Sequence, residues 1–222
     1  SAPLLEETHN QFEKITGHKI LERYGMTETN MNASNPLKGE RKAGSVGKPL
    51  KETSIRITSI GENNLSDMNQ PGMIEIKGPN VFTGYLNKPE KTKEAFTDDE
   101  YFITGDMGYF DKEGYLFISG RNKDLIISGG YNVYPKEIED IINQFDGIIE
   151  SAVFGLPDDD LGEIPAAAIV ANDNNPNLDN LKKFIQDNLA RYKVPKKYFL
   201  LSELPRNVMG KVQKTILKDR YL

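Results

Sequence analysis

The stretch YGMTET, residues 24–29, combines residues that could bind a phosphorylated ligand. Gly25 allows the backbone to approach a ligand closely, and Thr27 offers a hydroxyl. Glu28 offers a hard carboxylate that suits Mg²⁺ when phosphate oxygens complete the coordination shell. A plain turn from a strand into a loop, with a surface glutamate, explains the same residues without a ligand.

A second group of polar residues lies in YFITGDMGYFDKEGYLFISGRNKD, residues 101–124. Asp106 is expected at the end of an apolar strand, and the turn at EGY returns the chain to Arg121. A carboxylate and a guanidinium at adjacent strand ends could hold the two hydroxyls of a sugar, one accepting and the other donating hydrogen bonds. A structural salt bridge between them is an equally good interpretation.

The third group is LIISGGYNVYPKEIE, residues 125–139, where an apolar strand leads into Ser128, Gly129 and Gly130. Without side chains at the two glycines, a thin ligand could pass against the backbone. An ordinary hairpin turn is the alternative. The group directly follows Lys123 and Asp124, where a β-rich region gives way to an α+β region.

The stretch SELPRNVMGKVQK, residues 202–214, places Lys211 directly after Gly210, with Lys214 about one helical turn further on. Most lysines are solvated surface residues, so this pair indicates little by itself.

Composition excludes several other chemistries. The chain has 222 residues, a net charge of −5 and no cysteine, which excludes disulfide frameworks, thiol nucleophiles and Cys-ligated zinc. His9 and His18 are too few for a multi-histidine metal site, and they are expected on a surface helix. The acidic balance argues against a nucleic-acid partner. We find neither a membrane-spanning run nor a signal peptide, and expect a cytoplasmic protein of unknown oligomeric state.

The elements that must position these groups follow from hydrophobic periodicity. We expect helices over residues 3–17, 132–145, 178–196 and 211–222, with Pro195 ending the third of them. Short alternating runs between turn residues predict a β-rich region over about 44–119. From about residue 123 the expected order is helix, strand, strand, helix, strand, helix, an α+β module.

Together the motifs resemble the adenylate-forming acyl-CoA synthetases. YGMTE, TGD, GRNKDLIISGGYNVYPKEIE and PRNVMGKVQK are similar to four successive signatures of that family at about its usual spacing. The segments 22–36 and 77–92 are most similar to malonyl-CoA synthetases. The resemblance implies a mixed α/β fold (α+β), with a β-rich remnant of the large adenylation domain over 1–122 and a small mobile domain over 123–222.

The resemblance also implies roles for matching residues. Tyr24 would stack near adenine, Thr27 would contact the α-phosphate, Glu28 would hold Mg²⁺, and Asp106 and Arg121 would bind the ribose. Lys211 would be the catalytic lysine, and Lys214 a supporting one. The remaining implied sites are an ATP site that includes Gly25, Met26 and Lys211, a coenzyme A passage at Ser128, Gly129, Gly130 and Tyr131, and a hinge at Lys123.

The implied reaction is ATP-dependent activation of a small carboxylic acid, malonate or methylmalonate, followed by transfer to coenzyme A. Arg23 is a weak candidate for pairing with the distal carboxylate of malonate. Nothing in the chain resembles the family's upstream phosphate-binding loop, and Ser1–Ala2–Pro3 resembles the tail of its adenine-binding segment. We therefore expect a fragment that is inactive alone. Two alternatives are an adenylation domain that loads a carrier protein in trans and a non-catalytic nucleotide-binding fragment.

Overall fold

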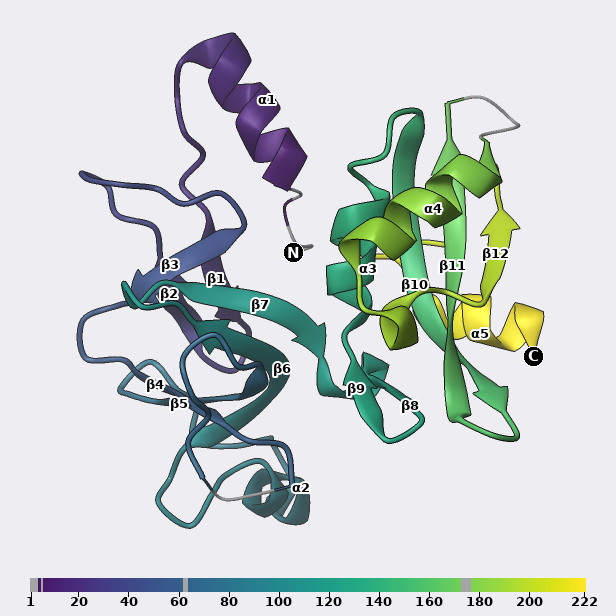
Figure 1. Cartoon of the computed structure of the whole chain (residues 1–222). Helices are drawn as coiled ribbons and strands as arrows, with labels where there is room; N and C mark the ends of the chain where they lie inside the picture. Colours follow the sequence, from purple (N-terminus) through teal and green to yellow (C-terminus); the bar gives the residue numbers. More distant parts are fainter. Residues whose placement is uncertain (1–3, 5, 62–63, 173–176) are drawn as a thin grey trace. The chain divides into compact units, whose positions relative to one another are not determined.

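The computed structural model describes residues 4, 6–61, 64–172 and 177–222 (Figure 1). The expectation for Ser1–Ala2–Pro3 lies outside these residues. The chain divides into two compact units, residues 4–122 and 123–222, which we call the N-terminal unit and the C-terminal unit. Each is described by itself.

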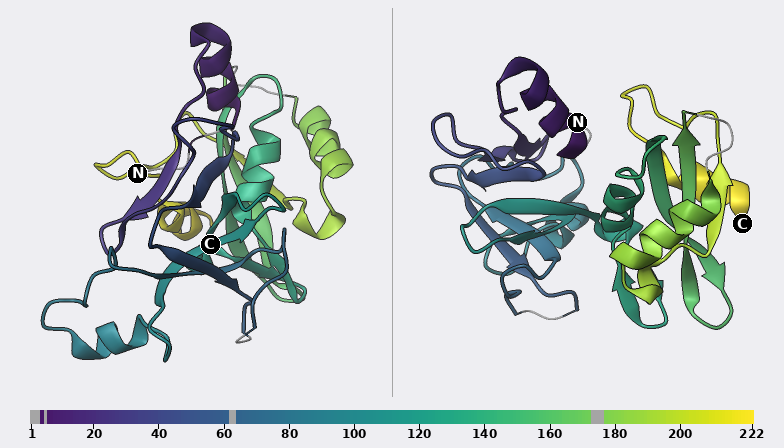
Figure 2. Two further views of the ribbon diagram at one scale, coloured as in Figure 1. Left: turned by 90° about the vertical axis from the view of Figure 1, so that its left-hand side faces the viewer. Right: turned by 45° about the horizontal axis from the view of Figure 1, so that its top comes forward.

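The N-terminal unit consists of a seven-stranded sheet and two short helices. Helix α1 (Glu6–Thr16) ends at Gly17, whose φ of 71° suits a glycine after a helix. Helix α2 (Pro89–Glu94) begins with a proline, which tolerates the first helical turn. The two helices lie at opposite ends of this unit (Figure 2).

The sheet of the N-terminal unit is antiparallel throughout, in the order β1-β2-β3-β7-β6-β5-β4. Its core contains apolar side chains of several strands, among them Ile74 and Ile76 of β5 and Leu116 of β7. The strands are β1 (Arg23–Met26), β2 (Asn30–Ser34), β3 (Ser45–Pro49), β4 (Ser54–Thr58), β5 (Gly72–Lys77), β6 (Phe102–Phe110) and β7 (Leu116–Arg121).

The C-terminal unit is an α+β sandwich. Its sheet has the order β10-β11-β8-β9, and β12 pairs with β11 in parallel. A short 3₁₀ helix, η1 (Asn122–Asp124), leads into it. The other elements are β8 (Ile126–Ser128), β9 (Tyr131–Val133), α3 (Pro135–Ile142), β10 (Ile148–Asp158), β11 (Gly162–Ala171), α4 (Leu178–Asn188), the 3₁₀ helix η2 (Arg191–Lys193), β12 (Lys197–Leu200) and α5 (Lys214–Tyr221).

Both faces of the β10–β11 pair are covered by helices (Figure 1). Ala167 and Ile169 of β11 pack with residues of α3 and α4 in one apolar cluster. Ala166 and Ala168, on the opposite face, pack in a second cluster with Leu217 of α5. Successive side chains of a strand point to opposite faces, so this run of small residues serves both clusters.

The mixed α/β fold, the β-rich N-terminal region and the presence of α3 agree with the sequence-based expectations. The bounds of three predicted helices are wrong. Helix α3 covers Pro135–Ile142 instead of 132–145, because residues before it pair with β8 as strand β9. Helix α4 ends at Asn188 instead of near Pro195, because Leu189 turns to an extended conformation and packs against the core. Helix α5 begins at Lys214, so Lys211 lies in the loop before it.

Two side chains also differ from expectation. Asp106 lies in the middle of β6, which continues to Phe110, because the strand pairs with β7 beyond the charged residue. His9 is buried, with 1% of its surface exposed, although the helix that carries it was expected to be solvated. Neither of its ring nitrogens has a hydrogen-bond partner among the described residues.

The described residues contain no helix that is long and apolar enough to cross a membrane. In the same part of the chain, no three His, Cys, Asp or Glu residues gather as a group that could hold a metal ion.

Candidate active site

Three of the predicted nucleotide-binding residues meet in the N-terminal unit. The Tyr24 hydroxyl donates a hydrogen bond of 2.6 Å to Oδ2 of Asp106, and Arg121 Nε lies 3.1 Å from Oδ1 of the same carboxylate. Asp106 and Arg121 are direct partners across β6 and β7. The salt bridge that we considered as the alternative therefore exists, and Tyr24, 82 positions away, joins it.

The Asp106 carboxylate is well anchored. Asp106 is 7% exposed. Its backbone N–H donates to the Thr104 hydroxyl, and that hydroxyl donates to the Ile74 carbonyl of β5. The next residue, Met107, is fully buried. The β6–β7 pairing shifts register between Met107 and Gly108, and such bulges redirect side chains next to sites. The strand thus fixes where Asp106 points.

The electrostatics of the group favour a protonated Tyr24. Burial, followed by the neighbouring Asp106 carboxylate, raises the pKa of the Tyr24 hydroxyl far above its ordinary value near 10. A carboxylate has about four lone-pair sites, so Asp106 can accept further hydrogen bonds beside those from Tyr24 and Arg121. Arg121 keeps 41% of its side chain exposed. The Asp106 carboxylate can therefore still accept a hydrogen bond from a diol, and the Arg121 guanidinium can still donate to it.

The YGMTE stretch forms β1 and the turn that follows it. Gly25 is needed for a close approach within the protein, since a Cβ at this position would lie 2.2 Å from the carbonyl oxygen of Asn30. Met26 ends the strand, and its carbonyl accepts from Thr29 N–H across the turn. Thr27 is exposed on that turn. The structural role of Gly25 is thus visible in the hairpin itself.

Glu28 is not part of the Tyr24–Asp106–Arg121 group in the contacts described. Its carboxylate accepts a hydrogen bond of 3.2 Å from the Tyr85 hydroxyl, and its carbonyl accepts one of 2.8 Å from Phe82 N–H. The Lys91 ammonium lies 4.6 Å from the centre of the Tyr85 ring. The segment 82–91 therefore holds Glu28 in place, which the sequence analysis did not predict.

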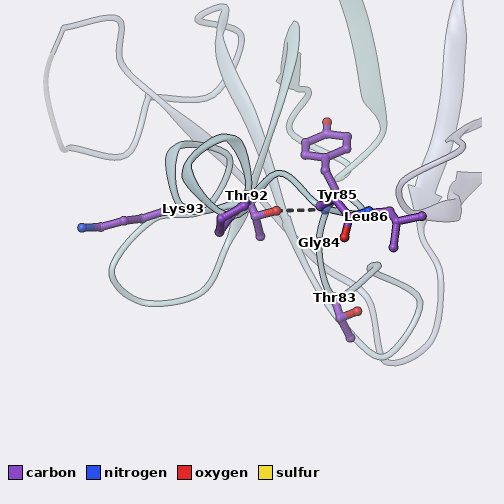
Figure 3. A pocket seen from close by; sticks show the side chains of 8 residues that line it. Thr83, Gly84, Tyr85, Leu86, Thr92 and Lys93 are labelled. Carbon is purple, nitrogen blue, oxygen red and sulfur yellow. Dashed lines mark hydrogen bonds between the residues drawn. The ribbon is translucent and has the colours of Figure 1, made fainter.

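This segment also lines a shallow pocket of about 580 Å³ (Figure 3). Its wall includes Gly84, Tyr85, Thr92 and Lys93, and the Thr92 hydroxyl accepts a hydrogen bond from Tyr85 N–H. The pocket lies in the stretch that resembles malonyl-CoA synthetases, and none of the predicted site residues lines it. Tyr85 connects it to Glu28.

The predicted coenzyme A passage is a hairpin turn between β8 and β9. Gly129 and Gly130 have φ values of 57° and 81°, which a two-residue turn of type I′ requires at both positions. The Gly129 N–H donates to the Leu161 carbonyl. Gly129, Gly130 and Tyr131 are exposed, and the Tyr131 ring stacks on Tyr192 at 4.7 Å, whereas Ser128 is 4% exposed. Three of the four residues thus lie at the surface of the turn.

Lys211 is exposed at the end of a tight turn in the C-terminal unit. Gly210, just before it, has a φ of 76°, a conformation that favours glycine. A Cβ at this position would meet no atom within 4 Å, so the backbone conformation and not crowding accounts for the glycine. The rival lysine is engaged elsewhere. Lys214 Nζ lies 2.6 Å from the Glu139 carboxylate, with 22% of its side chain exposed, so the prediction that Lys214 is solvated is wrong.

The other residues that we considered lie as follows. Arg23 begins β1 and is exposed, on the face opposite the buried Tyr24. Lys123 is exposed in η1, at the boundary between the two units.

Parts of both units match known protein families. Residues 1–86 match the AMP-binding enzyme family, and residues 137–211 match the AMP-binding enzyme C-terminal domain. A malonate–CoA ligase of Arabidopsis thaliana is 43% identical, and the match covers 98% of this chain and 37% of that protein. A probable CoA ligase of Humulus lupulus is 45% identical, with coverage of 95% and 36%.

Among solved structures, ATP-bound MatB from Rhodopseudomonas palustris superimposes with a TM-score of 0.94 at 50% identity, over 100% of this chain and 44% of that one. The chain therefore spans less than half the length of these relatives. The two matched segments together cover most of the chain, and they carry three of the four predicted signatures in whole or in part, while TGD lies between them. The chain belongs to the AMP-binding enzyme family.

Proposed function

We propose that the protein to which this chain belongs is an ATP-dependent ligase that joins a small carboxylic acid to the thiol of coenzyme A. The observation that carries this proposal is the hydrogen-bonded group of Tyr24, Asp106 and Arg121, which joins three separate signatures at one carboxylate. Family membership supports the same function. The CoA ligases among the relatives carry out related reactions by name.

ATP would bind through residues of the N-terminal unit. Asp106 and Arg121 would hold the ribose hydroxyls, with Tyr24 beside them near the adenine. The end of β1, with Gly25 and Met26, and the turn after it would face the phosphates, where the exposed Thr27 hydroxyl can donate to a phosphate oxygen.

Glu28 fits the requirement for Mg²⁺ in such a site. Magnesium in ATP sites is commonly held by one or two carboxylates together with phosphate oxygens and water. Glu28 supplies one carboxylate, already oriented by Tyr85. When bound, the ion would neutralise charge on the phosphates.

Lys211 would act in the first half reaction. A carboxylate oxygen of the acid attacks the α-phosphorus of ATP, a new phosphorus–oxygen bond forms, and the bond to pyrophosphate breaks. Negative charge grows on the incoming and departing oxygens, and a positioned ammonium stabilises it. Loss of such a group typically lowers the rate by about 10²-fold or more.

The second half reaction would use the C-terminal unit differently. The thiol of coenzyme A attacks the acyl carbon, and AMP leaves. We propose that the exposed turn at Gly129, Gly130 and Tyr131, with Ser128 at its base, lines the path of the thiol arm. Rotation at Lys123 would exchange Lys211 for this turn between the two steps.

The acid is proposed to be malonate or methylmalonate. Support comes from the named malonate–CoA ligase and MatB among the relatives. Other CoA ligases named for different acids also match, so the experiment compares several acids.

The experiment uses the full-length protein that contains this chain. Mg-ATP-dependent pyrophosphate release is measured with malonate, methylmalonate, acetate and a medium-chain acid, with and without coenzyme A. Lys211→Ala tests the catalytic lysine, and Lys214→Met serves as the matched variant because Lys214 pairs with Glu139. We expect malonate-dependent release and acyl-CoA formation, a loss of about 10²-fold for Lys211→Ala, and a much smaller change for Lys214→Met.

Release with another acid only would keep the ligase and discard malonate. Acyl transfer to a carrier protein without coenzyme A would favour carrier loading. No release with any acid, or full activity of Lys211→Ala, would contradict the proposal.

A further inference from the structure

The turn that carries Lys211 is held by a dense set of backbone contacts. Arg206 and Val212 face each other as an antiparallel bridge, and Asn207 N–H donates to the Lys211 carbonyl at 3.0 Å. The Asn207 side-chain oxygen accepts from Met209 N–H and from Lys211 N–H, each at 3.0 Å. Lys211 therefore has both its backbone polar groups bonded to Asn207.

The Arg206 guanidinium connects this turn to the sheet. Arg206 Nη1 donates a hydrogen bond of 2.7 Å to the carbonyl of Gly210, the residue bonded to Lys211. Arg206 Nη2 pairs with the Glu150 carboxylate. Glu150 lies on β10, where it is the partner of Val170 in β11, and 24% of its side chain is exposed.

Neighbouring ion pairs have a different task. Lys214 pairs with Glu139 and Lys218 with Glu163, and both lysines belong to α5. These pairs hold the helix. The pair of Arg206 and Glu150 instead reaches the backbone of the turn, one residue before Lys211.

We propose that Arg206 is a positioning residue for Lys211 and that Glu150 is its anchor in the sheet. This inference rests on the proposed function of Lys211. The planar guanidinium donates in two fixed directions, so it can hold the Gly210 carbonyl at a set distance from β10. A catalytic group displaced by about 1 Å can lose about 10²-fold in rate, so a turn that carries a catalytic lysine needs such a fixed support.

The test uses the full-length protein and separates the two half reactions. The variants are Arg206→Met, which removes both contacts, and Glu150→Gln, which weakens the anchor and keeps its shape. Lys136→Met is the matched control, because it removes an ion pair of the same unit, Lys136 with Asp140 on α3, away from the turn. Each is measured for adenylate formation with malonate and for thioester formation from supplied malonyl-adenylate and coenzyme A.

We expect Arg206→Met to lower kcat of adenylate formation by about tenfold or more, with KM for ATP and the thioester step changed by less than about twofold. Glu150→Gln should give a smaller loss of the same kind, and Lys136→Met should give none. Because Arg206 acts through Lys211, adding Arg206→Met to Lys211→Ala should lower the residual rate no further.

Three results would overturn the inference even where Lys211 keeps its proposed role. They are an equal loss in both half reactions, a further loss of about tenfold on the Lys211→Ala background, and full adenylate formation by Arg206→Met beside an inactive Lys211→Ala. The last would leave the proposed function standing. An active Lys211→Ala would instead contradict the role of the lysine, and this inference with it.

Discussion

At the scale of single residues, the buried Asp106 carboxylate is held by two side chains of the candidate site. It receives a hydrogen bond from Tyr24 and an ion pair from Arg121. Hydrogen bonds to charged groups contribute about 1.5–3 kcal/mol, more than those to neutral acceptors. Tyr24 therefore stabilises the fold and would support the proposed ATP site at once.

Tyr24→Phe removes this hydrogen bond and leaves the ring. We expect a loss of about 1.5–3 kcal/mol in the free energy of unfolding near pH 8 and a higher KM for ATP. Because the fold raises the pKa of Tyr24, its contribution is complete below the ordinary tyrosine pKa near 10. It is lost as the pH rises further, since the unfolded chain ionises first. Urea unfolding of the unsubstituted protein and of Tyr24→Phe, at pH 8 and above pH 10, measures the difference in their free energies of unfolding.

Tyr115→Phe is the matched control. The Tyr115 hydroxyl donates to a neutral acceptor, the Glu40 carbonyl, at 2.8 Å, and Tyr115 is buried as Tyr24 is. Its loss should be smaller, about 1 kcal/mol, with no change in KM for ATP. An unchanged KM in Tyr24→Phe would show that the hydroxyl does not support the nucleotide site.

At the scale of elements, Arg56 of β4 links three segments of the N-terminal unit. It pairs with Glu75, its cross-strand neighbour in β5, and with Asp99 in the turn before β6. Its guanidinium also lies 3.9 Å from the centre of the Tyr101 ring. The Arg56 and Thr97 side chains lower the pKa of Asp99 to about 2.

Asp99→Asn should destabilise the N-terminal unit at neutral pH, by less than Tyr24→Phe because Asp99 is at the surface. The fold lowers the Asp99 pKa, so its contribution is present above the ordinary pKa near 4. It is lost as the pH falls toward 2. The melting temperatures of the unsubstituted protein and of Asp99→Asn should therefore converge as the pH falls from 4 toward the pH at which acid unfolds the protein. Asp98→Asn, one residue earlier, is the control, and an equal effect there would contradict the role of Arg56.

The elements were the part of the structure best predicted from the sequence. Pro135, Ile138 and Ile142 show the periodicity of α3 directly, because a helix repeats its apolar face locally. The end of α4 was missed because Leu189 turns inward to pack, which is a tertiary effect. The burial of His9 was missed for the same reason.

Contacts between residues far apart in the sequence are the part of the candidate site that could not be predicted from the sequence. Motif spacing indicated Asp106, Arg121 and Lys211, but no local pattern connects Tyr24 to Asp106, which lies 82 positions away. Arg206 and Glu150 are 56 positions apart, and each alone resembles an ordinary surface charge. Tyr85 lies in the segment 77–92 that resembles malonyl-CoA synthetases, yet its bond to Glu28 depends on the fold.

At the scale of the whole molecule, the boundary between the two compact units falls between Asn122 and Lys123. The short helix η1 spans this boundary. The change of unit at Lys123 supports the proposed hinge at this residue. A hinge needs backbone freedom at few positions.

Lys123→Pro tests the hinge in the full-length protein. Proline fixes φ near −65° and restricts the preceding residue, so it should trap one arrangement of the units. We expect total acyl-CoA formation to fall by about 10²-fold while one half reaction keeps most of its rate. Lys112→Pro, in the turn between β6 and β7, is the control. Equal loss of both half reactions in Lys123→Pro would indicate misfolding and contradict the hinge.

The alanine run of β11 has a consequence for how the C-terminal unit opens. Its two faces belong to different apolar clusters, one under α3 and α4 and the other under α5. If either helical layer detaches, the strand stays covered by the other and remains bonded to β10. Its amide hydrogens should therefore exchange with solvent only through unfolding of the entire unit, so that β11 reports global stability while the Lys211 turn opens and closes independently of it.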